Sequence, residues 1–195
     1  MHLFSILPNV PRLSNANLAK AIFWVCCLIF FIHAPSHAQL KVGASAPEFD
    51  VSGALKGETI RVRLSDMLRQ GPIVLYFYPK AFTSGCTIEA QLFAENMDAF
   101  QASGATVLGM SGDDIETLKT FSAGPCGGKF AVASDQDQSV MKSYQAVHRL
   151  FGSFANRVSY VITPDRRILF VHEGSDPEQH VNRTLAAVKA WRSKQ

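Results

Sequence analysis

The 195-residue chain lacks the features that define several protein classes. It has little excess of charge, because it contains 19 Lys and Arg residues and 16 Asp and Glu residues, which gives a net charge of +3. So small an excess argues against a nucleic-acid-binding protein that relies on a basic surface. The 13 Gly and 9 Pro residues form no low-complexity tract or repeat, and 4 Cys residues are too few for a disulfide-rich miniprotein. The composition favours an ordinary globular protein with a proper core.

Residues 1–38 have the pattern of a secretory signal peptide. The first 20 positions contain basic residues and no acidic one, and residues 21–32 are all apolar. A helix of that length reaches about 18 Å, which is short of a hydrocarbon core of about 30 Å. Ser36 and Ala38 are the small residues expected before a cleavage site. We therefore expect cleavage after Ala38, export to the periplasm and no stable membrane contact afterwards. An uncleaved signal that anchors the chain is the alternative.

Removal of this segment also removes Cys26 and Cys27. Residues 39–195 then form one domain with two cysteines, Cys86 and Cys126. In an exported protein such a pair fits either a single structural disulfide or a redox pair. The surroundings of each cysteine must decide between these interpretations.

Strands and helices alternate along the rest of the chain. Continuous apolar, β-prone runs indicate strands buried on both faces, and alternating runs indicate half-exposed ones. We expect strands at residues 59–64, 73–78, 106–110, 130–133, 158–162 and 168–172, and helices at 65–70, 87–102, from 115 through 121, 138–147 and 176–191, after an irregular entry at 42–51. The last two strands form a hairpin. This order predicts an α/β three-layer sandwich with a central mixed β-sheet.

Cys86 lies where a buried strand ends and a helix begins. Free N–H groups and the helix dipole stabilise an anion there, so we expect a lowered thiol pKa and a reactive thiolate. Pro79 ends the strand and shields the cysteine on one side, and Thr83 can bring a hydroxyl beside the sulfur. The charge of Glu89 would oppose a thiolate unless it is turned onto a cation. The alternative is that Cys86 is a small buried hydrophobe.

These residues resemble a known family. The segment Tyr78-Pro79-Lys80-Ala81-Phe82-Thr83-Ser84-Gly85-Cys86-Thr87-x-Glu89-Ala90 resembles the peroxiredoxin active-site signature, in particular that of the bacterioferritin-comigratory, or peroxiredoxin Q, subgroup. Further matches, which extend the resemblance over nearly all of residues 41–192, are Gly43-x-x-Ala46-Pro47-x-Phe49, Gly109-x-Ser111-x-Asp113 and Arg157-x-x-Tyr160-x-Ile162. The resemblance implies a thioredoxin-like fold and a thiol-dependent peroxidase without metal or organic cofactor. It implies a hydroperoxide substrate, a thioredoxin-like or other dithiol reductant, and a monomer.

The resemblance also implies a role for each matching residue. Cys86 would be the peroxidatic cysteine, which attacks the O–O bond and becomes a sulfenic acid. Thr83 would hydrogen-bond the peroxide and the sulfur, and Pro79 would shield them. Arg157 would steady the thiolate and the peroxide oxygens. Glu89 would lie near that arginine.

Two positions depart from the family pattern. Ser84 replaces the usual proline before Gly-Cys, and Gln91 stands where many relatives carry their resolving cysteine. Cys126 is then the candidate resolving residue within the chain, in a Gly-rich segment that we expect to be mobile. A disulfide needs Cα atoms within roughly 7 Å, so we expect local unwinding around Cys86. The alternative is that Cys126 is a spectator and that an external thiol resolves Cys86.

The other polar residues give weaker signals. His148, His172 and His180 are isolated in the sequence, and we expect each to be a surface or internally satisfied residue. Neither a zinc-ligand cluster nor a phosphate loop is apparent. A non-enzymatic redox-sensing or binding module on a thioredoxin fold is the competing function. Such a module would react only slowly with peroxide.

Overall fold

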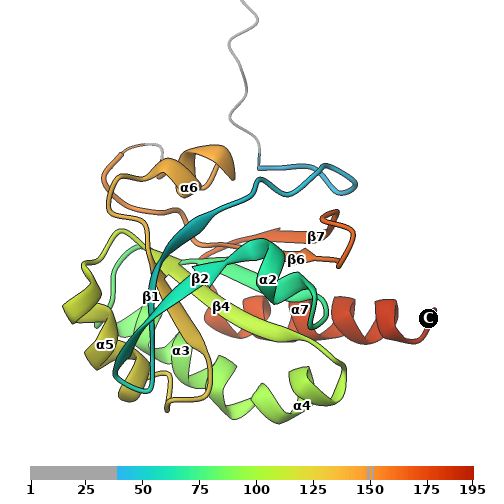
Figure 1. Ribbon diagram of the computed structural model, residues 1–195, viewed down its shortest axis with the longest axis horizontal. Coiled ribbons are helices and arrows are strands. Elements are labelled where there is room, and N and C mark those ends of the chain that lie inside the picture. The colour runs from blue at the N-terminus through green and yellow to red at the C-terminus, as the bar shows by residue number, and fades with distance from the viewer. Residues whose placement is uncertain (1–38, 149, 151) are drawn as a thin grey trace, which may run out of the picture. The chain divides into compact units, whose positions relative to one another are not determined.

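The fold is built on a mixed sheet. The computed structural model describes residues 39–148, 150 and 152–195, so the predicted signal peptide lies outside the described residues. The sheet has seven strands in the order β2-β1-β5-β4-β3-β6-β7 (Figure 1). Its strands are β1 (Asp50–Leu55), β2 (Glu58–Arg63), β3 (Ile73–Phe77), β4 (Thr106–Ser111), β5 (Ala131–Ser134), β6 (Val158–Ile162) and β7 (Ile168–Glu173). Strands β3, β4 and β5 pair in parallel and the other neighbours pair antiparallel.

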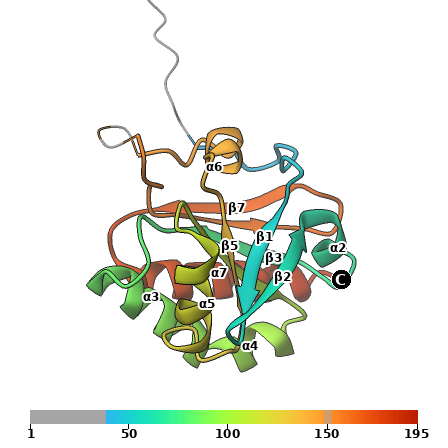
Figure 2. The same ribbon diagram turned by 60° about the vertical axis from the view of Figure 1, so that its left-hand side comes forward.

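Helices cover both faces of the sheet. They are α2 (Leu64–Leu68), α3 (Ser84–Glu95), α4 (Met97–Ala102), α5 (Ile115–Ala123), α6 (Ser139–Ser143) and α7 (Pro177–Arg192). Side chains of α3, α4, α5 and α7 share one buried cluster with the sheet, and those of α2 and α6 share the other. Figure 2 shows α6 on the opposite side of the sheet from α3, α4 and α5. The predicted three-layer, thioredoxin-like α/β architecture is confirmed.

Strand β3 shows why its sequence is apolar throughout. Val74 and Tyr76 belong to the cluster beneath α3, whereas Ile73, Leu75 and Phe77 belong to the opposite cluster. All five side chains are fully buried, and burial of such a side chain stabilises the fold by about 1.5–3 kcal/mol. The strand therefore holds its carboxyl end, and the loop that follows, in a fixed place.

Three predicted elements differ from the structure. Strand β1 occupies part of the expected irregular entry. The helix predicted over residues 87–102 is two helices, because it breaks at Asn96, whose side-chain amide donates to the Leu92 carbonyl at 2.9 Å. The helix predicted over 138–147 ends at Ser143, and Gln145 then takes a left-handed backbone conformation with φ of 55°. No helix in the described part of the chain is long and apolar enough to cross a membrane.

Candidate active site

The position of Cys86 follows from the junction between β3 and α3. After β3, the amide of Tyr78 still donates to the Met110 carbonyl of β4 at 3.1 Å, and the chain then turns through a loop into α3. Thr83 is the N-cap, and its carbonyl accepts the first helical hydrogen bond from the amide of Thr87 at 2.9 Å. Cys86 thus lies in the first turn, among the amides that have no partner within the helix. Its side chain is only 1% exposed.

The guanidinium of Arg157 lies against the sulfur of Cys86. Arg157 Nη2 is 3.4 Å from Cys86 Sγ, and the arginine side chain is 12% exposed. Arg157 comes immediately before β6, which begins at Val158 as the sequence predicted. Gly85 allows this approach, because a Cβ atom at that position would lie 3.2 Å from Arg157 Nη2. A fixed positive charge and N–H donors therefore face the cysteine.

Glu89 pairs with the same arginine. Its carboxylate contacts Arg157 Nη1, and its side chain is fully buried on the inward face of α3. Burial raises the pKa of Glu89, and the Arg157 charge opposes that shift. The carboxyl group of Glu89 therefore points to the Arg157 cation and does not directly oppose a negative charge on Cys86.

Thr83 and Pro79 lie in the loop that leads into α3. The Thr83 hydroxyl donates to the Lys80 carbonyl at 3.0 Å, so its oxygen keeps lone pairs that can accept a further hydrogen bond. Asp113 holds the same loop, because its carboxylate accepts from the amide of Ala81 at 2.7 Å and from the hydroxyl of Ser111 at 2.8 Å. Asp113 belongs to the motif Gly109-x-Ser111-x-Asp113, but the motif did not reveal that its carboxylate holds the loop.

A pocket with a mixed polar and apolar lining lies beside this loop. Its lining includes Pro79, Phe82 and Phe154 together with charged and polar side chains such as Lys80 and Asp113. Phe82 is 51% exposed, and its ring packs edge-on against Phe121 at a centroid distance of 5.2 Å. Its backbone is left-handed, with φ of 63°, which is uncommon for a bulky residue. Phe82 therefore presents an aromatic ring at the surface of the loop that leads into α3.

Cys126 lies in the core rather than in an exposed loop. It follows α5, its side chain is fully buried, and it belongs to the same buried cluster as Cys86. Its amide donates to the Phe121 carbonyl at 3.2 Å, and the amide of Gly128 donates to the Ser122 carbonyl at 2.9 Å. Burial raises the pKa of the Cys126 thiol. Both cysteines are free thiols in this structure.

Two residues behind the site had no signal in the sequence. His180 on α7 is fully buried, with Nδ1 2.8 Å from the Ser159 hydroxyl and 3.8 Å from Glu89 Oε1. The ring of His172 lies beside it, at a centroid distance of 4.6 Å. His172 and His180, which are isolated in the sequence, are therefore neighbours in space. Their contact depends on the packing of α7 against α3 and the sheet, which no local pattern reveals.

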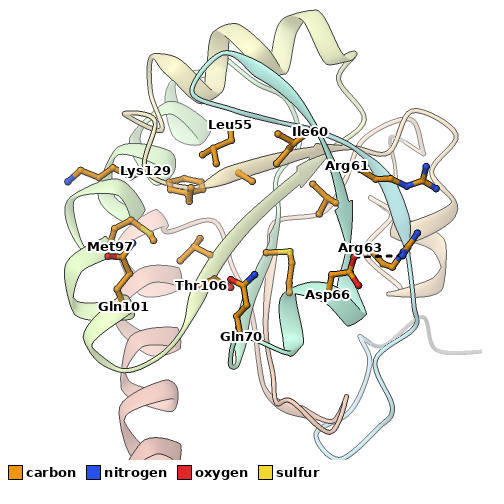
Figure 3. A pocket seen from close by; sticks show the side chains of 15 residues that line it. Leu55, Ile60, Arg61, Arg63, Asp66, Gln70, Met97, Gln101, Thr106 and Lys129 are labelled. Atoms are coloured by element: carbon orange, nitrogen blue, oxygen red, sulfur yellow. Dashed lines mark ion pairs between the residues drawn. The ribbon is translucent and has the colours of Figure 1, made fainter.

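A second pocket lies away from these residues. Leu55, Ile60, Met97 and Lys129 are among its lining side chains (Figure 3). It is bounded by β1, β2, α4 and β5, and none of the predicted site residues lines it. The residues expected to carry the chemistry therefore lie at the end of β3, away from this pocket.

Comparisons with known proteins agree with this geometry. The AhpC/TSA family profile matches residues 42–171. The chloroplastic peroxiredoxin Q of Sedum lineare is 31% identical over 154 residues, which cover 78% of this chain and 80% of that protein. The chloroplastic peroxiredoxin Q of Triticum aestivum is 34% identical over 152 residues, covering 77% and 68%.

Solved structures give the same result. The peroxidoxin BcpB of Mycobacterium tuberculosis superposes with a TM-score of 0.70 at 28% identity, covering 77% of this chain and 97% of that one. The AhpC of the same organism shares the fold, with a TM-score of 0.71 at 20% identity, covering 81% and 96%. The chain belongs to the AhpC/TSA family, and it is a thiol-dependent peroxidase of the peroxiredoxin type.

Proposed function

We propose that Cys86 is the peroxidatic cysteine. Its thiolate attacks the terminal oxygen of a hydroperoxide, the O–O bond breaks, and the sulfur gives up two electrons as the sulfenic acid forms. The leaving oxygen departs with the bonding electron pair and takes a proton to become water or an alcohol. The observation that carries this proposal is the 3.4 Å approach of Arg157 Nη2 to Cys86 Sγ at the start of α3.

Arg157, Thr83 and Pro79 serve this step in different ways. The guanidinium of Arg157 favours the thiolate and offers N–H groups to the charge that develops on the leaving oxygen. The oxygen of Thr83 accepts a hydrogen bond from the peroxide O–H, because its own proton is engaged by the Lys80 carbonyl. Pro79 ends the segment after β3 on the side of Cys86 and offers no competing N–H. Glu89 holds the guanidinium in place.

Cys126 then resolves the sulfenic acid. Its thiol attacks the Cys86 sulfur, a disulfide forms and water leaves, and a thioredoxin-like dithiol reduces the disulfide by exchange. Cys86 and Cys126 are both buried in the same cluster, and we propose that the first turn of α3 and the segment after α5 open locally as the disulfide forms. The alternative is an external thiol that resolves Cys86 directly.

The exposed rings of Phe82 and Phe154 indicate which hydroperoxides the site can accept. Hydrogen peroxide needs only the polar groups around Cys86. The exposed rings of Phe82 and Phe154 offer contact to the hydrocarbon part of an alkyl hydroperoxide. We therefore assign both hydrogen peroxide and alkyl hydroperoxides as substrates.

Location and assembly are also part of the proposal. The basic start, the apolar centre and the small residues before position 39 support export and cleavage after Ala38. We propose that the mature protein acts in the periplasm and that it is a monomer. Fractionation of cells that express the full chain, followed by mass measurement of the recovered protein, tests both the location and the cleavage.

Peroxide consumption tests the proposed chemistry. The reduced protein should consume hydrogen peroxide rapidly in a single turnover, and Cys86→Ser should abolish the reaction while the fold is kept. Cys126→Ser should leave the single turnover intact. A protein in which Cys86→Ser reacts as fast as the unchanged chain would not use this cysteine, and slow reaction of the unchanged chain would favour the redox-sensing module.

A further inference from the structure

A buried polar cluster lies directly behind Arg157. It joins α3, β6 and α7 through Glu89, Ser159 and His180, and each of these side chains is fully buried. Glu89 Oε2 contacts Arg157, but Glu89 Oε1 is buried without a hydrogen-bond partner and lies 3.8 Å from His180 Nδ1. A buried carboxylate oxygen without a partner is costly, so this contact calls for a reason.

The hydrogen bonds of His180 fix the state of its ring. His180 Nε2 lies 3.0 Å from the Gly174 carbonyl, which can only accept, so Nε2 carries a proton. In the neutral ring Nδ1 is then an acceptor, and the Ser159 hydroxyl donates to it at 2.8 Å. Because Ser159 engages the lone pair of Nδ1, this nitrogen offers no proton to Glu89 Oε1, which lies 3.8 Å away. The ring nitrogen and the carboxylate oxygen therefore repel each other unless Glu89 carries a proton.

We propose that His180 is a positioning residue for Cys86: together with Glu89 it holds one proton in the core, and loss of this proton weakens the hold of Arg157 on the Cys86 sulfur. This inference rests on the proposed role of Cys86. With the proton present, the Glu89–His180 pair is neutral overall, and the charge of Arg157 is available to the thiolate. When the proton leaves to water, the carboxylate neutralises the charge of Arg157, and the thiolate is left without a compensating positive charge.

The surroundings of the pair are consistent with a single retained proton. Burial raises the pKa of Glu89 and lowers the pKa of His180, and both shifts favour a protonated Glu89 beside a neutral imidazole. The titratable and charged groups that face the pair from the packed elements are Cys86, Arg157, Tyr76, His172 and Asp176. Arg157 is the cation of this set whose Nη1 contacts the Glu89 carboxylate.

The inference predicts an alkaline decline in the rate constant of the peroxide reaction with Cys86. His180→Gln keeps an amide that can donate to the Gly174 carbonyl but removes the titrating ring. The ring nitrogen then no longer disfavours the Glu89 carboxylate, so the proton on Glu89 is lost more easily. The decline should move by about one pH unit towards neutrality, which makes the rate constant about tenfold lower on the alkaline side. Ser159→Ala should move the decline the other way, because it frees Nδ1 for the proton of Glu89.

The experiment is a single-turnover measurement of the reduced protein with hydrogen peroxide across the alkaline range. Thr184→Val is the matched control, since Thr184 is fully buried one turn further along α7 and its hydroxyl bonds only helix carbonyls. Opposite displacements in the His180 and Ser159 variants, with none in the control, would support the inference. Coincident profiles in folded variants would overturn it, and Ser159→Ala alone decides if His180→Gln does not fold. A chain that does not react with peroxide at any pH would instead overturn the role of Cys86.

Discussion

Arg157 Nη2 lies 3.4 Å from Cys86 Sγ although 71 positions separate the two residues in the chain. The contact exists because β6 pairs with β3, so that the residue before β6 comes beside the loop that follows β3. Sheet pairing therefore brings the cation to the nucleophile.

Arg157→Lys keeps the positive charge but loses the planar fork of donors. We expect the rate constant for the peroxide reaction to fall by about a hundredfold, because one donor directed at a developing oxyanion contributes about that much. Stopped-flow measurement on the reduced protein gives the value. Arg192→Lys, at an exposed position in the last turn of α7, is the control. A rate constant close to that of the unchanged protein would show that Arg157 is not needed as a guanidinium.

Gly85→Ala tests the close approach of the guanidinium. The added Cβ would lie 3.2 Å from Arg157 Nη2, so the arginine must shift by a few tenths of an ångström. We expect slower reaction with peroxide and unfolding free energy that is unchanged or higher, since alanine is favoured over glycine in a helix by roughly 0.5–1 kcal/mol. Denaturant unfolding and stopped-flow kinetics measure the two effects. Gly152→Ala, where a Cβ meets no atom within 4 Å, should change neither, and equal rate constants for both variants would contradict the account.

Cys126→Ser should separate the two halves of the catalytic cycle. We expect the sulfenic acid on Cys86 to persist and turnover with thioredoxin to fail, while a small monothiol still supports turnover. Cys126→Ala is the companion variant, because it places no hydroxyl in the buried site that Cys126 occupies. Unchanged turnover of both variants with thioredoxin would mean that Cys126 is a spectator.

His180 makes the free energy of unfolding depend on pH in the acidic range. Burial lowers the pKa of His180 from 6.5 to about 4, so the unfolded chain binds more protons than the native one between these values. The free energy of unfolding should therefore fall as the pH drops from 6.5 towards 4, by about 2–3 kcal/mol from this residue. His180→Gln should remove that part of the slope in denaturant titrations at several pH values. A slope equal to that of the unchanged protein would contradict the burial of a neutral imidazole.

The core strands could be predicted because their sequences carry the signal locally. Residues 73–78 are continuously apolar, and strand β3 is indeed buried on both faces. Strand β1 escaped prediction because Gly53 interrupts it. That glycine is needed where the strands meet, since a Cβ there would lie 2.6 Å from a Val62 methyl and 2.9 Å from the Val132 carbonyl oxygen.

Some residues of the site could also be predicted from local sequence, and others could not. Cys86 and its loop could be found from local order, and Arg157 from its motif. The burial of Cys126 and the contact of His180 with Glu89 depend on how α5 and α7 pack, and nothing local reports that packing. The Gly-rich segment around Cys126 predicts a loop, and its backbone hydrogen bonds close a turn that buries the thiol, which the sequence did not indicate.

The most direct test of the account is the reaction of the fully reduced protein with one equivalent of hydrogen peroxide, followed by mass spectrometry of its peptides. We predict either a single oxygen added to Cys86 or a disulfide between Cys86 and Cys126, and neither product in Cys86→Ser. Oxidation that begins at Cys126, or peroxide left unconsumed by the unchanged protein, would contradict the assignment of Cys86 as the reacting group.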